Sequence, residues 1–165
     1  MIFSNPVEVV FDTSALLGAA IFEKEKGEKG KAKEALEYLN AQCHKLVLSR
    51  EIVEESTGRL WINGARGSPY IRKLIDSLDE LERRGKVIRL PKDVKLEFVD
   101  LGFQIPEDLE HDIHVLKTAV SVKGKRRGIT VCLVHKNPND FDPIKEEMRR
   151  MHDIRVLSPE EYVDP

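Results

Sequence analysis

An apolar run near the N-terminus that ends in an acid constrains the fold more than any other feature of this 165-residue chain. Residues 7–11 read Val-Glu-Val-Val-Phe, a pattern that suits a strand buried on both faces of a parallel sheet. Asp12 follows this strand, at the edge where open α/β sheets bind their ligands. Thr13 and Ser14 are able to cap the next helix, which would leave Asp12 free for a cation or for chemistry. The sequence therefore predicts a site at the end of this strand.

Strand-like and helical segments alternate along the rest of the chain. Apolar spacing predicts helices over 15–23, 31–43, 50–62, 69–84, 106–122 and 143–151, and strands over 45–48, 87–90, 129–134 and 154–157. Residues 91–105 are ambiguous, with helix as one interpretation. Residues 135–142 are interpreted as a polar loop. Gly85 is expected to end the helix before it. Such alternation predicts one α/β domain over residues 1–165, with a parallel sheet covered by helices on both faces.

Composition limits the classes of protein to which the chain can belong. The formal net charge of -2 excludes a polycation, so any nucleic-acid surface must be a local patch. The two cysteines, Cys43 and Cys132, are expected to be reduced and structural. No apolar run approaches the ~20 residues that cross a bilayer, and no secretory signal is visible at the N-terminus. We therefore expect a cytoplasmic protein with no membrane partner.

Acidic residues gather in four places where the strand ends of such a sheet would meet. The four groups are Asp12; Glu51, Glu54 and Glu55; Asp108, Glu110 and Asp112; and Asp140 with Asp142. Carboxylates brought together repel one another, and one or two bound cations hold them in place. Because oxygen ligands dominate and histidines are few, the expected ion is Mg²⁺ or Mn²⁺. The pair His111 and His114 is interpreted as solvated or packed rather than as ligands of a transition metal.

The order and spacing of these motifs resemble the PIN domain family over nearly the whole chain. The matching elements are residues 9–16, Ser49 with Ile52 and Glu55, Asp112 with Ala119, the strand 129–134 followed by Asp140 and Phe141, and residues 157–162. Proteins of this family have a Rossmann-like α/β/α sandwich fold, and many are metal-dependent ribonucleases. The resemblance therefore implies that fold, and hydrolysis of phosphodiester bonds in single-stranded RNA.

The resemblance also implies a set of site residues. Carried over by position, the acids that bind Mg²⁺ or Mn²⁺ and support catalysis are Asp12, Glu55, Asp112 and Asp140. Glu54 is the alternative to Glu55, because a shift of one residue in the alignment would exchange them. Asn137 stands where the family commonly has its fourth acid, and Asp140 is the substitute for it. Asp140 and Asp142 have a second interpretation, as caps of the helix predicted from residue 143.

Polar and basic residues near the strand ends are candidates for substrate contacts. Thr13 and Ser14 would orient a water molecule or an acid, and Lys136 and Asn137 follow the strand 129–134. The one concentrated basic run, over residues 123–128, supplies Lys125, Arg126 and Arg127. This run is either a phosphate contact or a solvated turn.

The resemblance extends to partners. It implies RNA as a partner, and homodimers, antitoxins and RNA-processing partners occur in the family. The apolar face of the helix 69–84 would serve either as a dimer interface or as a cover for the sheet.

Three functions stay open on the sequence alone. The first is a metal-dependent ribonuclease, and the second is a PIN-like RNA-binding or scaffold protein without catalysis, which Asn137 in the acidic position favours. The third is a small-molecule or nucleotide-binding α/β domain. It is disfavoured because Asp12-Thr13-Ser14 is not a glycine-rich phosphate loop.

Overall fold

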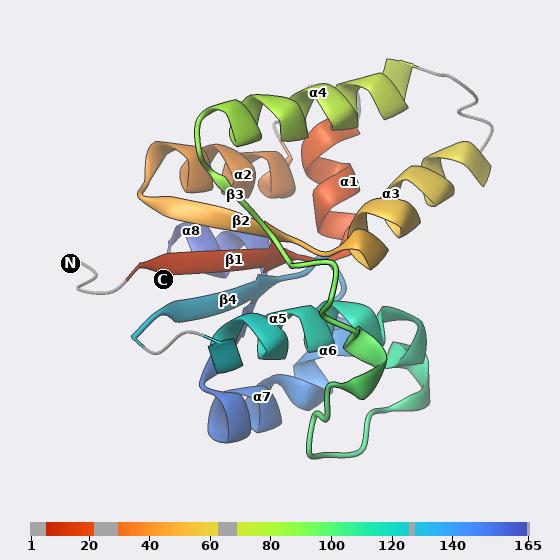
Figure 1. The fold of residues 1–165 in the computed structure, drawn as a ribbon, viewed down its shortest axis with the longest axis vertical. Coiled ribbons are helices and arrows are strands. Elements are labelled where there is room, and N and C mark those ends of the chain that lie inside the picture. Colours follow the sequence, from red (N-terminus) through yellow and green to blue (C-terminus); the bar gives the residue numbers. More distant parts are fainter. Residues whose placement is uncertain (1–5, 22–29, 63–68, 126–127, 165) are drawn as a thin grey trace.

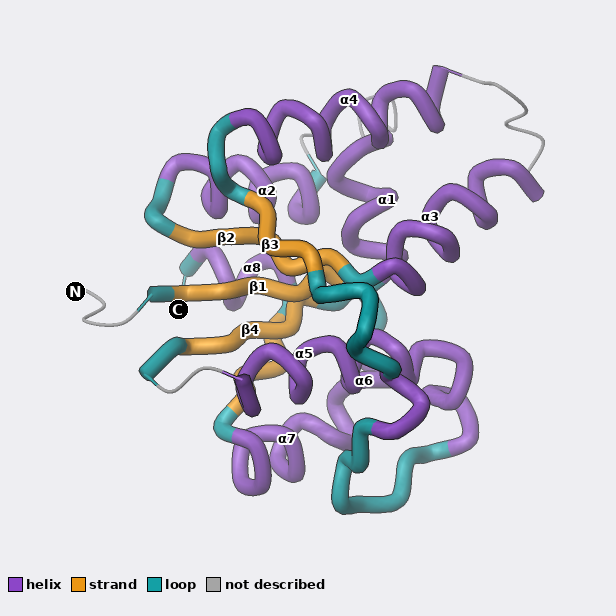
Figure 2. The backbone as a smooth tube through the Cα atoms, viewed as in Figure 1, coloured by secondary structure: helices purple, strands orange, loops and turns teal. Residues whose placement is uncertain are grey.

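The computed structural model describes residues 6–21, 30–62, 69–125 and 128–164, and its core is one parallel sheet (Figures 1 and 2). The sheet has five strands in the order β3-β2-β1-β4-β5. The strands are β1 (Val7–Phe11), β2 (His44–Leu48), β3 (Val87–Arg89), β4 (Thr130–Val134) and β5 (Ile154–Leu157). The helices are α1 (Thr13–Ile21), α2 (Lys31–Ala41), α3 (Arg50–Ile62), α4 (Pro69–Arg83), α5 (Ile113–Lys125), α6 (Pro138–Phe141), α7 (Lys145–His152) and α8 (Pro159–Val163). Three 3₁₀ turns, η1 (Leu96–Phe98), η2 (Glu107–Asp112) and η3 (Asp142–Ile144), complete the described elements.

Helices cover both faces of this sheet. Parallel strands need crossover connections, and right-handed crossovers place α1–α4 on one side and α5 with α7 on the other, as Figure 1 shows. The last helix, α8, returns to pack against α2. The predicted α/β/α sandwich with a Rossmann-like parallel sheet is therefore confirmed.

The first strand lies at the centre of the core, as its sequence predicted. All five residues of β1 are buried, including Glu8 at 2% exposure. Its neighbour β4 contributes Val131, Leu133 and Val134, each fully buried. Such two-sided burial explains why these strands read as nearly continuous apolar runs rather than alternating ones.

The carboxyl ends of β1 and β4 meet where the sheet changes direction. From β1 the chain crosses toward β2, whereas from β4 it crosses toward β5, which makes these strand ends the point where open α/β sheets generally bind ligands. The last aligned pair is Phe11 with Val134, and the Asp12 amide donates to the Val134 carbonyl at 2.9 Å. Asp12 and His135 therefore begin the two loops that frame this carboxyl edge.

The helix α4 buries its apolar face within the chain. Leu74, Leu78 and Leu81 are 1%, 6% and 4% exposed and belong to the main core. Of the two sequence interpretations, the structure supports α4 as a cover rather than as a free interface. Gly85, at φ +70°, ends α4 as predicted, and the Lys86 amide donates to the Leu81 carbonyl at 2.8 Å.

Two segments differ from the sequence expectations. Residues 135–142 are not wholly a loop, because α6 begins at Pro138, whose ring suits the first position of a helix. The expected helix 106–122 starts instead as the 3₁₀ turn η2, and its α-helical part, α5, runs only from Ile113. Residues 91–105 contain the short turn η1. None of the described helices is both long and apolar enough to cross a membrane.

Candidate metal centre at the carboxyl edge of the sheet

Three side chains that could hold a metal ion converge beside α6. His111 and Asp112 end η2 and Asp140 lies in α6, and one ligand atom from each lies within 4.8 Å of the other two. Asp112 is buried at 7% exposure, whereas His111 is exposed. We call these three residues the His-Asp-Asp group. It brings together two of the acids expected from the sequence and adds His111, which sequence reasoning interpreted as solvated or packed.

Asn137 fixes one of the two carboxylates. Its side-chain amide donates a hydrogen bond to Asp140 Oδ2 at 2.6 Å. Asn137 immediately precedes α6, so the first turn of that helix places Asp140 within reach of the amide. Asn137, which stands where the resemblance would place a fourth acid, thus positions the carboxylate of Asp140. Such outer partners orient metal ligands and tune their basicity.

Asp12 has a local partner in the helix that follows it. Its Oδ1 accepts a hydrogen bond from the Ala15 amide at 2.7 Å, and the side chain is buried. The expectation that Thr13 or Ser14 would cap α1 is wrong, because α1 begins at Thr13 and Asp12 is therefore the capping residue. Within the described residues, Asp12 belongs to no group of three potential metal ligands.

The two hydroxyl residues after Asp12 differ in accessibility. Thr13 is fully buried, and its hydroxyl makes no hydrogen bond to a described residue. Ser14 is exposed on the first turn of α1. Only Ser14 of this pair is therefore open to a water molecule or a substrate.

Glu55 contacts His114 rather than joining the His-Asp-Asp group. The Glu55 Oε2 atom contacts His114 Nε2, and both side chains are largely buried, at 21% and 16% exposure. The contact joins α3 to α5. Glu54 is exposed and instead contacts Arg50, with an N–O distance of 2.7 Å. Glu55 is therefore the less exposed acid of the two and the one that contacts α5.

The two histidines three residues apart serve different partners. His111 Nε2 lies 3.3 Å from Asp112 Oδ2, whereas His114 contacts Glu55 on another helix. The three-residue spacing of the two histidines would suit a shared metal, but each histidine contacts a different carboxylate. The expectation that the pair does not hold one transition metal between its two rings agrees with this geometry.

The residues directly after β4 point in different directions. His135 is buried at 1% exposure and stacks on Phe141, with ring centroids 4.9 Å apart, and burial lowers its pKa below the ordinary value. Lys136 extends over α1, since a methyl group built on Gly18 would lie 3.2 Å from Lys136 Nζ. The absence of a side chain at Gly18 therefore leaves room for the Lys136 ammonium where it lies over α1.

The described start of the basic run, residues 123–125, lies at the opposite edge of the sheet. Residues 123–125 end α5 and precede β4, so they sit at the amino edge, and β4 spans roughly 16 Å at about 3.3 Å per residue. Lys123 Nζ donates to the Ile129 carbonyl at 2.6 Å and lies 3.3 Å from Asp153 Oδ2. Lys125 ends α5, and Arg126 and Arg127 lie outside the described residues.

An aromatic cluster of Tyr38, His44 and Tyr162 joins α2, the first residue of β2 and α8. His44 Nδ1 lies 2.5 Å from the Tyr162 hydroxyl, and the Tyr38 and Tyr162 rings meet edge to face with centroids 5.2 Å apart. Burial lowers the pKa of His44 and raises that of Tyr162, so both stay neutral near pH 7. The cysteines are free as expected, and burial raises the pKa of Cys132 to about 11.

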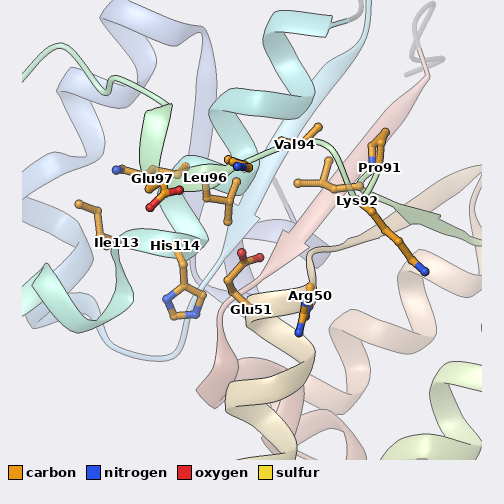
Figure 3. A pocket seen from close by; sticks show the side chains of 12 residues that line it. Arg50, Glu51, Pro91, Lys92, Val94, Leu96, Glu97, Ile113 and His114 are labelled. Carbon is orange, nitrogen blue, oxygen red and sulfur yellow. The ribbon is translucent and has the colours of Figure 1, made fainter.

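A groove of about 890 Å³ adjoins the residues that follow Asp112. Its walls come from the start of α3, the segment after β3 and the start of α5, and Figure 3 shows His114 and Glu51 within it. Two of its lining residues, Ile113 and His114, directly follow Asp112 of the candidate metal centre in the sequence.

Comparisons with known proteins add no family assignment. No protein-family model matches the chain, and no curated protein matches it. The PIN resemblance stays a prediction from motif order, and the site must be judged on its geometry.

Proposed function

We propose that the protein is a metal-dependent endoribonuclease of the PIN type that hydrolyses phosphodiester bonds in single-stranded RNA, using Mn²⁺ or Mg²⁺, in the cytoplasm. The observation that carries the proposal is the meeting of Asp112 and Asp140 with His111 at the carboxyl edge of the sheet. Open α/β sheets bind ligands at that edge, where the strand order reverses. The order of motifs along the sequence supports the same assignment.

The donor set fits a small divalent cation. Two carboxylates and one imidazole offer ligand atoms within 4.8 Å of one another, close to the roughly 4 Å that separates opposite ligands around an ion bound at about 2.1 Å. Carboxylates suit both Mg²⁺ and Mn²⁺, and an imidazole is better tolerated by Mn²⁺. Mn²⁺ is therefore the ion we expect to support the higher activity.

The chain's own residues would perform distinct tasks. When bound, the ion would supply a water of lowered pKa and stabilise the charge that develops on the phosphate. Asp112 and Asp140 would hold it, and Asn137 would keep the Asp140 carboxylate in position. Asp12 would hold the start of α1 beside the site through the Ala15 amide, which leaves exposed Ser14 to hydrogen-bond a water or a phosphate oxygen.

One observation favours the second candidate, an RNA-binding protein without catalysis. Two of the four family acids already have protein partners, because Asp12 caps α1 and Glu55 pairs with His114. The His-Asp-Asp group would then supply fewer carboxylates than the family uses. This alternative predicts that RNA is retained without turnover under any divalent metal.

Cleavage of a mixed single-stranded RNA pool with Mn²⁺, with Mg²⁺ and with chelator tests the proposal. The Asp112→Asn variant should lose at least about 100-fold in rate, as the loss of one strong electrostatic contact to the transition state does. Asp108→Asn is the matched control, because Asp108 is an exposed acid on the same turn. Asp12→Asn is a useful second variant, since asparagine caps helices as well as aspartate does and keeps α1 intact.

The outcomes separate the two candidates. Metal-dependent cutting that Asp112→Asn abolishes and Asp108→Asn preserves supports the nuclease. Cutting that persists unchanged in Asp112→Asn would sink the assignment of the site. RNA retained by folded, metal-loaded protein with no cutting would favour the binding role instead.

A further inference from the structure

The groove beside the candidate metal centre is richer in cations than the chain as a whole. Four of its lining residues are cationic and two are acidic, in a protein whose net charge is -2. The cations are Arg50, Lys92, Lys95 and Lys117, and the acids are Glu51 and Glu97. The groove is therefore a local positive patch of the kind that an acidic protein needs in order to bind a polyanion.

Most of these cations are available to a ligand. Lys92, Lys95 and Lys117 form no salt bridge with any residue that the structure describes, whereas Arg50 contacts Glu54 at 2.7 Å. Lys92 and Lys95 are exposed on the segment between β3 and η1. This contrasts with Lys123 in the basic run, whose ammonium is held by the Ile129 carbonyl and Asp153.

An exposed aromatic ring lies on the same segment. Phe98 ends η1 directly after Leu96 and Glu97, which line the groove, and it is 78% exposed. It is the most exposed of the large apolar side chains that the structure describes. Exposure of a phenyl ring next to unpaired lysines is the combination that binds single-stranded nucleic acids, because bases stack on the ring while cations follow the phosphates.

We propose that this groove binds a single strand of nucleic acid, with Lys92, Lys95 and Lys117 on its phosphates and Phe98 stacked on an unpaired base. The inference deepens the proposed function, on which the choice of RNA rests, and it assigns substrate binding to a surface other than the basic run. Ile113 and His114 line the groove and directly follow Asp112 in the sequence, so we expect a strand seated there to lead toward the His-Asp-Asp group. Lys123, the first residue of the basic run, lies before β4 at the amino edge of the sheet, away from this groove.

Binding of a fluorescein-labelled single-stranded RNA oligonucleotide in chelator tests this assignment, because no cleavage occurs and binding is read alone. The variant Lys92→Ala/Lys95→Ala removes two phosphate contacts from an exposed segment. Each lost contact on a single strand lowers affinity about fivefold at about 0.1 M salt, so the pair should weaken binding about 25-fold and flatten its salt dependence. Phe98→Ala should weaken binding about tenfold through lost stacking.

A matched control removes the same charge elsewhere. Arg72→Ala/Arg150→Ala changes two exposed cations on α4 and α7, outside the groove, and should change affinity less than about twofold. A duplex of the same sequence should bind more weakly, because its bases are not free to stack. A DNA strand of the same sequence identifies the ligand: weaker binding assigns the groove to RNA, and equal binding assigns it to any single strand.

Three results would overturn the assignment. They are the absence of RNA binding by the wild type in chelator, wild-type affinity in Lys92→Ala/Lys95→Ala, and an equal loss in the control variant. The nuclease proposal fails separately, since RNA bound through the groove without cutting in Mn²⁺ would leave the groove standing. Conversely, metal-dependent cutting with binding insensitive to these lysines would reject the groove alone.

Discussion

The two edges of the sheet carry the same kinds of side chain but arrange them in opposite ways. At the amino edge the polar groups pair with one another, as His44 does with Tyr162 and Lys123 with the Ile129 carbonyl. At the carboxyl edge Asp112 and Asp140 converge, and the nearby groove lysines form no salt bridge with described residues. Among the described residues, side chains that could share a metal ion gather only beside α6, at the carboxyl edge, whereas the polar groups of the amino edge contact one another.

The largest expected effect concerns the stability of the buried aromatic cluster around Tyr162. Tyr162→Ala should lower the free energy of unfolding by about 3–5 kcal/mol, because it removes a buried ring that packs against Phe11, Tyr38 and His44. Phe98→Ala, an aromatic truncation at the carboxyl edge, should cost no more than about 0.5 kcal/mol. Urea denaturation followed by circular dichroism measures both. Equal losses of unfolding free energy in the two variants would contradict the distinction between the buried aromatic cluster and the exposed Phe98.

A smaller effect concerns the hydrogen bond from Asn137 that positions the Asp140 carboxylate. Asn137→Ala removes the 2.6 Å hydrogen bond to the carboxylate and should weaken Mn²⁺ binding about tenfold with little change in stability. Asn139→Ala, an exposed asparagine of the same short helix, is the control and should bind Mn²⁺ as the wild type does. Calorimetric titration with Mn²⁺ provides the measurement, and identical affinities for the two variants would contradict a positioning role for Asn137.

The smallest effect is a dependence of stability on pH. Burial lowers the pKa of His44 and of His135 from 6.5, so the unfolded chain takes up protons at a higher pH than the folded chain does. The stability linked to these histidines is therefore present above pH 6.5 and is lost as the pH falls through 6.5 toward the folded pKa values. The urea concentration at the midpoint of unfolding should decrease as the pH is lowered from about 7.5 to about 5.5, and the decrease should be smaller in His44→Gln. A midpoint that rises on acidification would show that these histidines are not buried in the neutral form.

Much of the fold was predictable because it depends on local patterns. The buried run of β1, the alternation of strands with helices and the end of α4 at Gly85 all follow from residue types and spacing. The meeting of Asp112 and Asp140 was likewise predictable from the rule that parallel strands share one carboxyl edge.

The rest of the site depends on details that spacing does not carry. Whether Asp12 or Thr13 caps α1 depends on where that helix begins, which differs by only one or two residues. The contact of Glu55 with His114 joins residues far apart in the sequence, so no local pattern indicates it. The groove escaped prediction because Lys92 and Lys95 lie in a segment without periodicity. The position of the basic run could have been found, since it precedes β4 rather than following it.

Mn²⁺ binding, read from the electron paramagnetic resonance signal of the free ion, tests the central claim most directly, because it needs no substrate. Wild-type protein should take up Mn²⁺ saturably, and Asp112→Asn should bind it about 100-fold more weakly. Asp108→Asn, changed on the same turn, should match the wild type. If the wild type fails to bind Mn²⁺, or if both variants bind it equally well, the His-Asp-Asp group is not a metal centre.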